Sequence, residues 1–210
     1  MEISTARRFS GSKSLKETYI GDNPTNTGAP SCWMDRYYPS TEELWSRVYV
    51  FLDGFKASNV GSKMIFFGSN QYPNFWHYFR TASSNNYELD LQGAVLSGPA
   101  EWLNSGSTPT GRWVCLEQHV KMNTPGIPNA VFQTWMDGVQ KLNRTDITFR
   151  NATTTATTKF QFTRMFRQHG QGVIYFDDFA VSVSGRIGCS GSAPASDTTA
   201  PQTPTGITIK

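Results

Sequence analysis

Apolar side chains alternate one by one with polar or aromatic ones along much of this chain. Between residues 45 and 53 the apolar positions share one parity and the others the opposite parity: Val48, Val50 and Leu52 against Arg47, Tyr49 and Phe51. A period of two is that of a β-strand, whose successive side chains point to opposite faces. Further predicted strands cover residues 87–92, 112–123, 131–137, 146–150, 159–168 and 173–183. The sequence therefore predicts many strands with one apolar face and one mixed face.

Turn signals separate the predicted strands, and helical signals are sparse. Gly-containing turns stand at Asp53-Gly54, at residues 123–126, at Asp137-Gly138 and at residues 169–172. Asp137-Gly138 follows a predicted strand directly and is the strongest hairpin signal in the chain. No segment keeps an amphipathic helical pattern for two turns. These features predict an all-β fold, a two-sheet antiparallel jelly roll.

Net charge and hydropathy exclude two kinds of partner. The 210 residues include 19 Lys and Arg against 16 Asp and Glu, which gives a net charge of +3. Nucleic-acid binders usually present a basic stripe, so no nucleic-acid partner is expected. No apolar run reaches about 18 residues, so no membrane span is expected. The 14 Phe, 8 Tyr and 6 Trp indicate a folded, aromatic-rich domain instead.

Composition changes sharply near the C-terminus. Residues 190–204 are rich in Ser, Thr, Ala and Pro, as in an extended linker. Residues 203–209 resemble the first strand of a fibronectin type III domain. We therefore predict a jelly-roll domain over 1–189, a linker over 190–204 and the start of a truncated fibronectin type III-like domain over 205–210.

This organisation favours one monomeric domain of a larger secreted or cell-surface bacterial protein, although the N-terminal residues show no secretion signal.

Cysteine usage leaves the pairing open. Cys32 and Cys189 lie near the two ends of the predicted fold, where terminal strands often pair, so a disulfide between them is one expectation. Cys115 lies inside a predicted strand and is expected to be a buried free thiol.

Five fragments in order resemble a known family. They are Phe9 to Leu15, Arg47 to Val50, Gly111 to Glu117, Trp135 to Gly138 and Tyr175 to Asp178. Together they resemble the concanavalin-like jelly rolls of polysaccharide lyases, of the glucuronan- and alginate-lyase kind, and of related carbohydrate-binding modules. The resemblance covers about residues 5–185 and implies a concanavalin-like β-sandwich. It implies a polysaccharide partner, which could be acidic, and leaves catalysis open because the fold hosts lyases and binders alike.

Ionisable and aromatic residues gather on the mixed strand faces. They are Arg47, Tyr49, Glu117, His119, Lys121, Gln133 and Trp135. If the strands that contain Arg47 and His119 share one sheet, these side chains line one groove. Such a groove suits β-elimination of a uronic-acid polymer, which needs a base, an acid and a group that neutralises the uronate carboxylate.

The candidate catalytic residues follow from these three needs. Arg47, Gln133 or Lys121 could neutralise the carboxylate. His119 is the candidate base, because an imidazole can take up a proton near neutral pH. A tyrosine, Tyr49 or Tyr175, could protonate the leaving oxygen. The resemblance implies the same residue types in these roles.

Each assignment has a structural alternative. His119 on a strand could be a structural hydrogen-bonding residue. Trp135 could stack on a sugar ring or cover a sheet edge, and Glu117 and Tyr175 join it as candidate carbohydrate-binding residues. The two functional hypotheses are therefore a polysaccharide lyase and a non-catalytic carbohydrate-binding module, and a structural or adhesive surface domain is the third.

Asp177 and Asp178 are the candidate metal ligands. Adjacent strand residues point to opposite faces, so one of the two carboxylates points inward and needs a partner. Calcium could be that partner as a structural ion, and backbone donors from an early loop around Asp22 are the alternative. No cofactor is required for the predicted chemistry.

Overall fold

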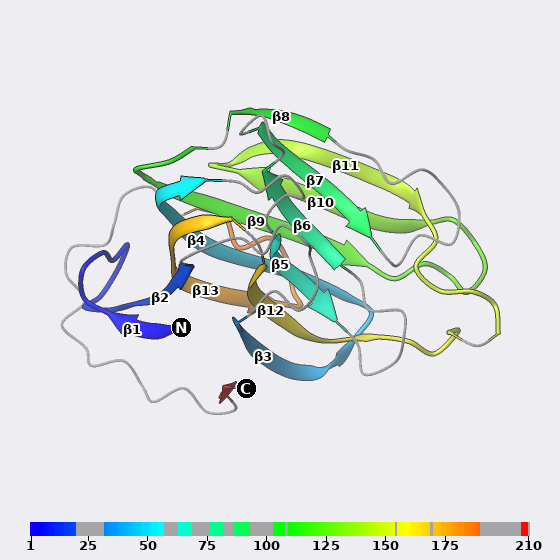
Figure 1. The fold of residues 1–210 in the computed structure, drawn as a ribbon. Helices are drawn as coiled ribbons and strands as arrows, with labels where there is room; N and C mark the ends of the chain where they lie inside the picture. The colour runs from blue at the N-terminus through cyan, green and yellow to red at the C-terminus, as the bar shows by residue number, and fades with distance from the viewer. Residues whose placement is uncertain are drawn as a thin grey trace.

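The computed structural model describes residues 1–19, 32–56, 63–68, 76–81, 86–92, 103–107, 109–153, 155–168, 170–189 and 207–209, and every helix or strand element in these ranges is a strand (Figure 1). The largest sheet has seven strands in the order β1 (Glu2–Ser4), β2 (Ser14–Tyr19), β13 (Gln171–Ser182), β4 (Glu43–Lys56), β9 (Trp113–Lys121), β10 (Ala130–Met136) and β11 (Val139–Ile147). All its pairs are antiparallel.

The second layer consists of two smaller sheets. One has the order β14 (Ile207–Ile209), β3 (Cys32–Thr41), β12 (Phe160–Gln168) and β5 (Lys63–Gly68), and the other the order β6 (Trp76–Thr81), β7 (Asn86–Gln92) and β8 (Leu103–Ser107). β5 and β6 lie side by side, so the two sheets continue one another in front of the seven-stranded sheet (Figure 1). The predicted two-layer antiparallel jelly roll is confirmed. No helix among the described residues is long and apolar enough to cross a membrane.

The apolar parity of the large sheet builds the core, as predicted. Buried side chains from three neighbouring strands of this sheet are Leu44, Val48, Val50, Leu52, Val114, Leu116, Val120, Phe132 and Met136. Phe149 and Phe160 pack edge to face at one end of this core. The opposite parity of the same strands points away from the core, and we call this surface the polar face.

The predicted hairpin between β10 and β11 is also confirmed. Asp137 and Gly138 connect the strands with φ angles of 51° and 80°. Both residues are left-handed, as a type I′ turn requires.

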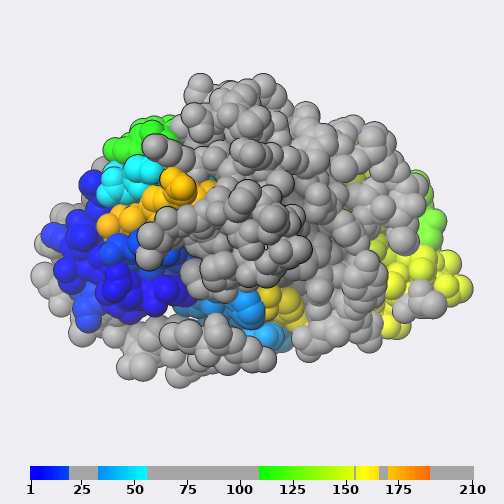
Figure 2. Space-filling model, in the orientation of Figure 1, coloured from blue at the N-terminus to red at the C-terminus, as the bar shows by residue number. Residues whose placement is uncertain are grey.

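The N-terminal strands belong to the large sheet, and the last described strand, β14, belongs to the second layer. β2 pairs with β13, so the N-terminal segment lies beside β13 and β4 although it is distant in sequence (Figure 2). β14 pairs with β3 through Ile207, Thr208 and Ile209. The predicted linker, residues 190–204, lies outside the described residues, and the division into domains stays a prediction.

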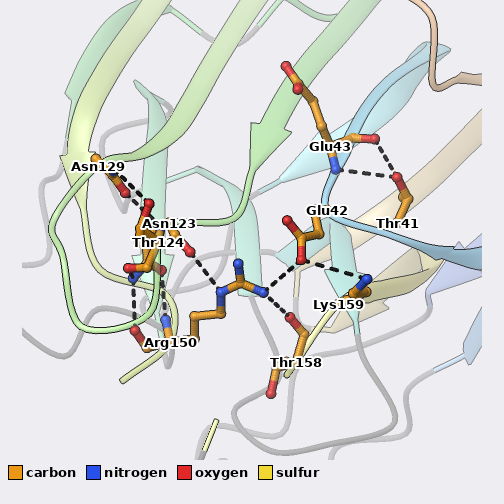
Figure 3. A network of polar contacts seen from close by, with 9 residues as sticks. All are labelled: Thr41, Glu42, Glu43, Asn123, Thr124, Asn129, Arg150, Thr158 and Lys159. Atoms are coloured by element: carbon orange, nitrogen blue, oxygen red, sulfur yellow. Dashed lines mark hydrogen bonds and ion pairs between the residues drawn. The ribbon is translucent and has the colours of Figure 1, made fainter. Parts of the chain in front are cut away.

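A buried polar network closes one end of the sheet (Figure 3). Asn123 is fully buried; its Oδ1 accepts the N–H groups of Phe149 and Arg150, both at 2.9 Å, and its Nδ2 donates to the Arg150 carbonyl at 2.8 Å. Arg150 donates from Nε to the Asn123 carbonyl at 2.7 Å and from Nη1 to Glu42 at 3.3 Å. The network joins the loop after β9 to the segment after β11 and satisfies backbone groups that the sheet leaves unpaired.

Gly172 occupies a bulge between β13 and β4 that only glycine fits. Its φ is +97°, and a Cβ at this position would lie 2.5 Å from the Gly54 carbonyl oxygen. We expect Gly172→Ala to lower the free energy of unfolding by about 3 kcal/mol, because it adds a backbone clash to the strain of a left-handed residue. Gly138→Ala, with φ +80° and open space around the Cβ, is the control and should cost about 1 kcal/mol. Equal losses in urea denaturation would contradict the packing argument.

Candidate functional site

The polar face brings the predicted site residues into three neighbouring strands. β4 and β9 are adjacent, with Trp45 opposite His119 and Arg47 opposite Glu117. β10 lies on the other side of β9, with Gln133 opposite His119 and Trp135 opposite Glu117. The assumption that the strands of Arg47 and His119 share one sheet is therefore confirmed. The side chains form two cross-strand rows, one centred on His119 and one on Glu117.

His119 is the centre of the first row. Its Nε2 lies 2.9 Å from Glu43 Oε1, and its Nδ1 lies 2.7 Å from Gln133 Oε1. The imidazole stacks on the Trp45 indole with ring centroids 4.3 Å apart and planes 2° from parallel. The residue is 9% exposed, so these contacts fix its orientation. We call Glu43, Trp45, His119, Lys121, Gln133 and Asn143 the His119 cluster.

Hydrogen bonds continue from His119 in both directions. Lys121 Nζ lies 3.1 Å from Glu43 Oε2, and Gln133 Nε2 donates to Asn143 Oδ1 at 2.8 Å. The chain of contacts thus crosses β4, β9, β10 and β11, which at the usual strand spacing is about 14 Å. Asn143 and Lys121 are exposed at its ends, while Glu43 and Gln133 are half-buried. This row is long enough and open enough to contact a short stretch of a polymer.

Glu43 holds a negative charge beside the imidazole. Burial raises the pKa of this carboxyl, but hydrogen bonds from His119 and Lys121 outweigh that effect and bring the pKa below its ordinary value. The ionised carboxylate can only accept, so Nε2 of His119 donates to it. Nδ1 then donates to Gln133 when the ring is doubly protonated. When the ring is neutral and the amide is turned over, Nδ1 accepts from Gln133.

The second row is covered by residues 185–189, which we call the C-terminal strap. Glu117 is 2% exposed and accepts from Arg186 Nε and Nη2 at 3.2 and 2.6 Å and from the Gly188 N–H at 2.8 Å. The Arg186 guanidinium also lies over the Trp135 ring, 4.4 Å from its centroid. The strap therefore buries Glu117 and lies against Trp135, the two predicted carbohydrate-binding residues of this row.

A disulfide anchors the strap, and its partners differ from those predicted. Cys115 pairs with Cys189, with their Cα atoms 6.0 Å apart. Cys115 is thus not a free thiol, and Cys189 does not pair with Cys32. The physical reason is that the chain folds back across the polar face after β13, which places Cys189 over β9. The parity of Cys115 carried a signal, because it shares the polar face with Glu117 instead of the apolar face.

Arg47 and Tyr49 are enclosed by both ends of the fold. Arg47 Nη2 lies 2.9 Å from Asp178 Oδ2, and Nη1 donates to the Gly188 carbonyl at 3.2 Å. Tyr49 is 3% exposed and stacks on Phe9 with ring centroids 3.5 Å apart. Tyr175, 5% exposed, packs edge to face on Phe51. The structure brings His119, Gln133 and Lys121 together in one cluster. The two tyrosines lie outside this cluster and pack against Phe9 and Phe51.

The acidic pair receives N–H donors and a cation. Asp177 accepts backbone N–H groups of Phe9 at 2.6 Å, Ser10 at 3.2 Å and Asp178 at 2.7 Å, and Asp178 pairs with Arg47. Burial raises the pKa of Asp177 and the N–H donors oppose that rise.

Calcium takes about six to eight oxygen ligands, and among the described residues no group of three His, Cys, Asp or Glu side chains placed to hold a metal ion includes Asp177 or Asp178. Within the described part of the chain, the one group of three metal-ligand side chains is Cys115, Glu117 and Cys189, and its sulfurs form the disulfide. Calcium stays an expectation, and no step below depends on it.

No family model and no curated protein sequence matches the chain. Solved structures do match. An endo-β-1,4-glucuronan lyase from the fungus Trichoderma reesei has a TM-score of 0.61 and 15% identity over 87% of this chain and 86% of that chain.

Two further solved structures match this chain with similar scores. The cellulose induced protein Cip1 has a TM-score of 0.59 and 18% identity over 90% of this chain and 87% of its own, and a PL-14 alginate lyase from Aplysia kurodai has a TM-score of 0.59 and 12% identity over 86% of both. The fold is that of the jelly-roll polysaccharide lyases. The resemblance expected from the five fragments is thereby confirmed for the fold.

Four residues at the polar face were not predicted from the sequence. Glu43 and Trp45 have the same parity as Arg47 and could have been found by extending the alternation toward the N-terminus. Asn143 required the β10–β11 register, in which it lies opposite Gln133. Arg186 had no signal, because it follows the last predicted strand and reaches the face only through the strap.

Proposed function

We propose that the protein binds a uronic-acid polysaccharide along the His119 cluster and cleaves it by β-elimination, with His119 as the base. The observation that carries this proposal is the arrangement of His119 between Glu43 and Gln133, on the outer face of a lyase-type jelly roll. Two structures of the same fold are named for glucuronan and alginate, which supports a polymer of uronic acids.

Binding the polymer is the part that the surface chemistry supports most directly. Lys121 is half-exposed and cationic, and the amide groups of Gln133 and Asn143 offer N–H donors to a carboxylate. Trp45 supplies aromatic surface beside them and is half-buried, with its ring stacked on His119. A carboxylate that binds at this point is neutralised next to the imidazole, which acidifies the adjacent C–H bond.

The elimination itself follows a balanced course on one side chain. The neutral imidazole takes the proton beside the uronate carboxyl group at Nδ1 after the Gln133 amide turns to the substrate carboxylate. The electron pair of that C–H bond forms the carbon–carbon double bond, and the bond to the leaving oxygen breaks. The imidazolium returns its proton to that oxygen, and Glu43 stabilises the cation in between. His119 serves as both base and acid here because Tyr49 and Tyr175 lie outside the His119 cluster, packed against Phe9 and Phe51.

One observation favours a non-catalytic carbohydrate-binding module as the second candidate. Neither predicted tyrosine acid faces solvent, and Glu117, Arg47 and Asp178 are engaged in contacts with the strap or with each other. A binding surface needs only the exposed ends of the His119 cluster, Lys121 and Asn143, and the half-buried residues between them.

A polymer panel separates these functions. The protein is incubated with glucuronan, mannuronate-rich alginate, guluronate-rich alginate and neutral cellulose, and the ultraviolet absorbance of the unsaturated uronate product is followed together with binding. We expect binding and product formation with at least one uronic-acid polymer. A single base and acid on one side of the ring favours polymers whose C5 hydrogen and C4 oxygen lie on the same side, glucuronan and mannuronate-rich alginate. Binding without product selects the module, and neither signal refutes both.

A further inference from the structure

The C-terminal strap presents one guanidinium at the surface of the polar face. Arg186 uses Nε and Nη2 to bond the two Glu117 oxygens, and its side chain remains 40% exposed. Within the described part of the chain no residue bonds its Nη1. An arginine has five N–H donors, and the bidentate pair with Glu117 uses two of them.

Arg186 lies next to the His119 cluster. Its partner Glu117 and His119 are two residues apart on β9 and share the polar face, so their Cα atoms are about 7 Å apart. Trp135, which the guanidinium covers, is likewise two residues from Gln133 on β10. Arg186 therefore lies to one side of a polymer that runs along the His119 cluster, where it can meet the carboxylate of a neighbouring sugar unit that points to that side.

Three contacts hold the C-terminal strap in place before any ligand arrives. The disulfide ties Cys189 to β9, the Gly188 N–H donates to Glu117 at 2.8 Å, and the Gly188 carbonyl accepts from Arg47 at 3.2 Å. The Trp135 ring supports the flat face of the guanidinium. A side chain fixed in this way loses little conformational freedom on binding.

We propose that Arg186 binds the carboxylate of the uronate unit next to the one that His119 acts on, and thereby selects acidic polymers over neutral ones. The planar guanidinium fork matches a carboxylate, and its pairing with Glu117 sets its direction. This inference rests on the proposed function, because it assigns a second subsite on the same face. Arg186 is a specificity-determining residue in this scheme and takes no part in proton transfer.

The test compares Arg186→Gln with Arg112→Gln, which removes an exposed arginine from a surface ion pair with Asp137. Binding is measured by calorimetry to glucuronan and to the same polymer after chemical reduction of its carboxyl groups. We expect Arg186→Gln to weaken binding of the acidic polymer about tenfold and to leave binding of the reduced polymer unchanged. Arg186→Lys should weaken acidic binding about threefold, and Arg112→Gln should leave both affinities within twofold.

A second variant removes the structural ambiguity. Arg186→Gln leaves the buried Glu117 carboxylate with fewer partners, which could unfold the strap. The double variant Glu117→Gln/Arg186→Gln removes that charge as well and should show the same selective tenfold loss.

The outcomes distinguish this inference from the proposed function. The subsite is overturned if Arg186→Gln and the double variant bind the acidic polymer as tightly as the wild type does. It is also overturned if they lose equal affinity for the acidic and the reduced polymer while the wild type still binds and cleaves. A wild type that binds neither polymer overturns the proposed function and the subsite together.

Discussion

Replacing His119 by glutamine lowers the rate of polymer cleavage by at least about 100-fold, while the affinity for the polymer changes by less than about threefold. A positioned general base contributes about 100- to 10,000-fold to a proton transfer, and glutamine has no group that can take the proton. Glutamine can still bond Glu43 and Gln133, so the surface of the cluster is largely kept. The measurement is the initial rate of unsaturated product formation, with the affinity obtained separately by calorimetry.

Two comparison variants make this result specific. His169→Gln makes the same chemical change at a histidine that follows β12 in the sequence and should leave the rate within twofold. Glu43→Gln removes the carboxylate that stabilises the imidazolium and should lower the rate about tenfold or more with little change in affinity. Cleavage that survives His119→Gln at more than a tenth of the wild-type rate would exclude His119 as the base.

The sequence predicts the site as far as strand parity reaches. Alternation assigned Val48 and Leu116 to the core and Arg47, Glu117 and His119 to the opposite face, and the structure agrees. Parity is local, because each side chain is directed by its own backbone. The adjacency of β4 and β9 was an assumption that parity could not provide, and the structure shows it.

Strand parity does not predict which other segments of the chain cover a face of the sheet. Glu117 has the position of a solvated residue, yet the strap buries it under Arg186 and Gly188. Tyr49 is likewise on the polar face but packs under Phe9 of the N-terminal segment. Both covering segments are irregular and distant in sequence, so no periodic pattern reports where they lie. The same limit explains why the partner of Cys189 could not be predicted.

Removing the Cys115–Cys189 disulfide lowers the free energy of unfolding by about 4 kcal/mol. The cross-link joins residues 74 positions apart, and closing a loop of that size restricts the unfolded chain by about this amount in the chain-entropy model. The double variant Cys115→Ser/Cys189→Ser avoids a free thiol that could pair with Cys32. Urea denaturation followed by tryptophan fluorescence measures the change, and Cys32→Ser, the same substitution at the third cysteine, is the control with a loss below about 1 kcal/mol.

The double serine variant also separates the two effects of the strap. The Arg186 and Gly188 contacts to Glu117 do not need the disulfide, so the strap can still close over Glu117, although it is less firmly held. We therefore expect stability to fall by about 4 kcal/mol while the affinity for acidic polymer falls only about threefold, less than in Arg186→Gln. The disulfide then acts mainly on the unfolded chain, and Arg186 acts on the ligand. A double variant that is as stable as the wild type with its disulfide intact would contradict the cross-link as a source of stability.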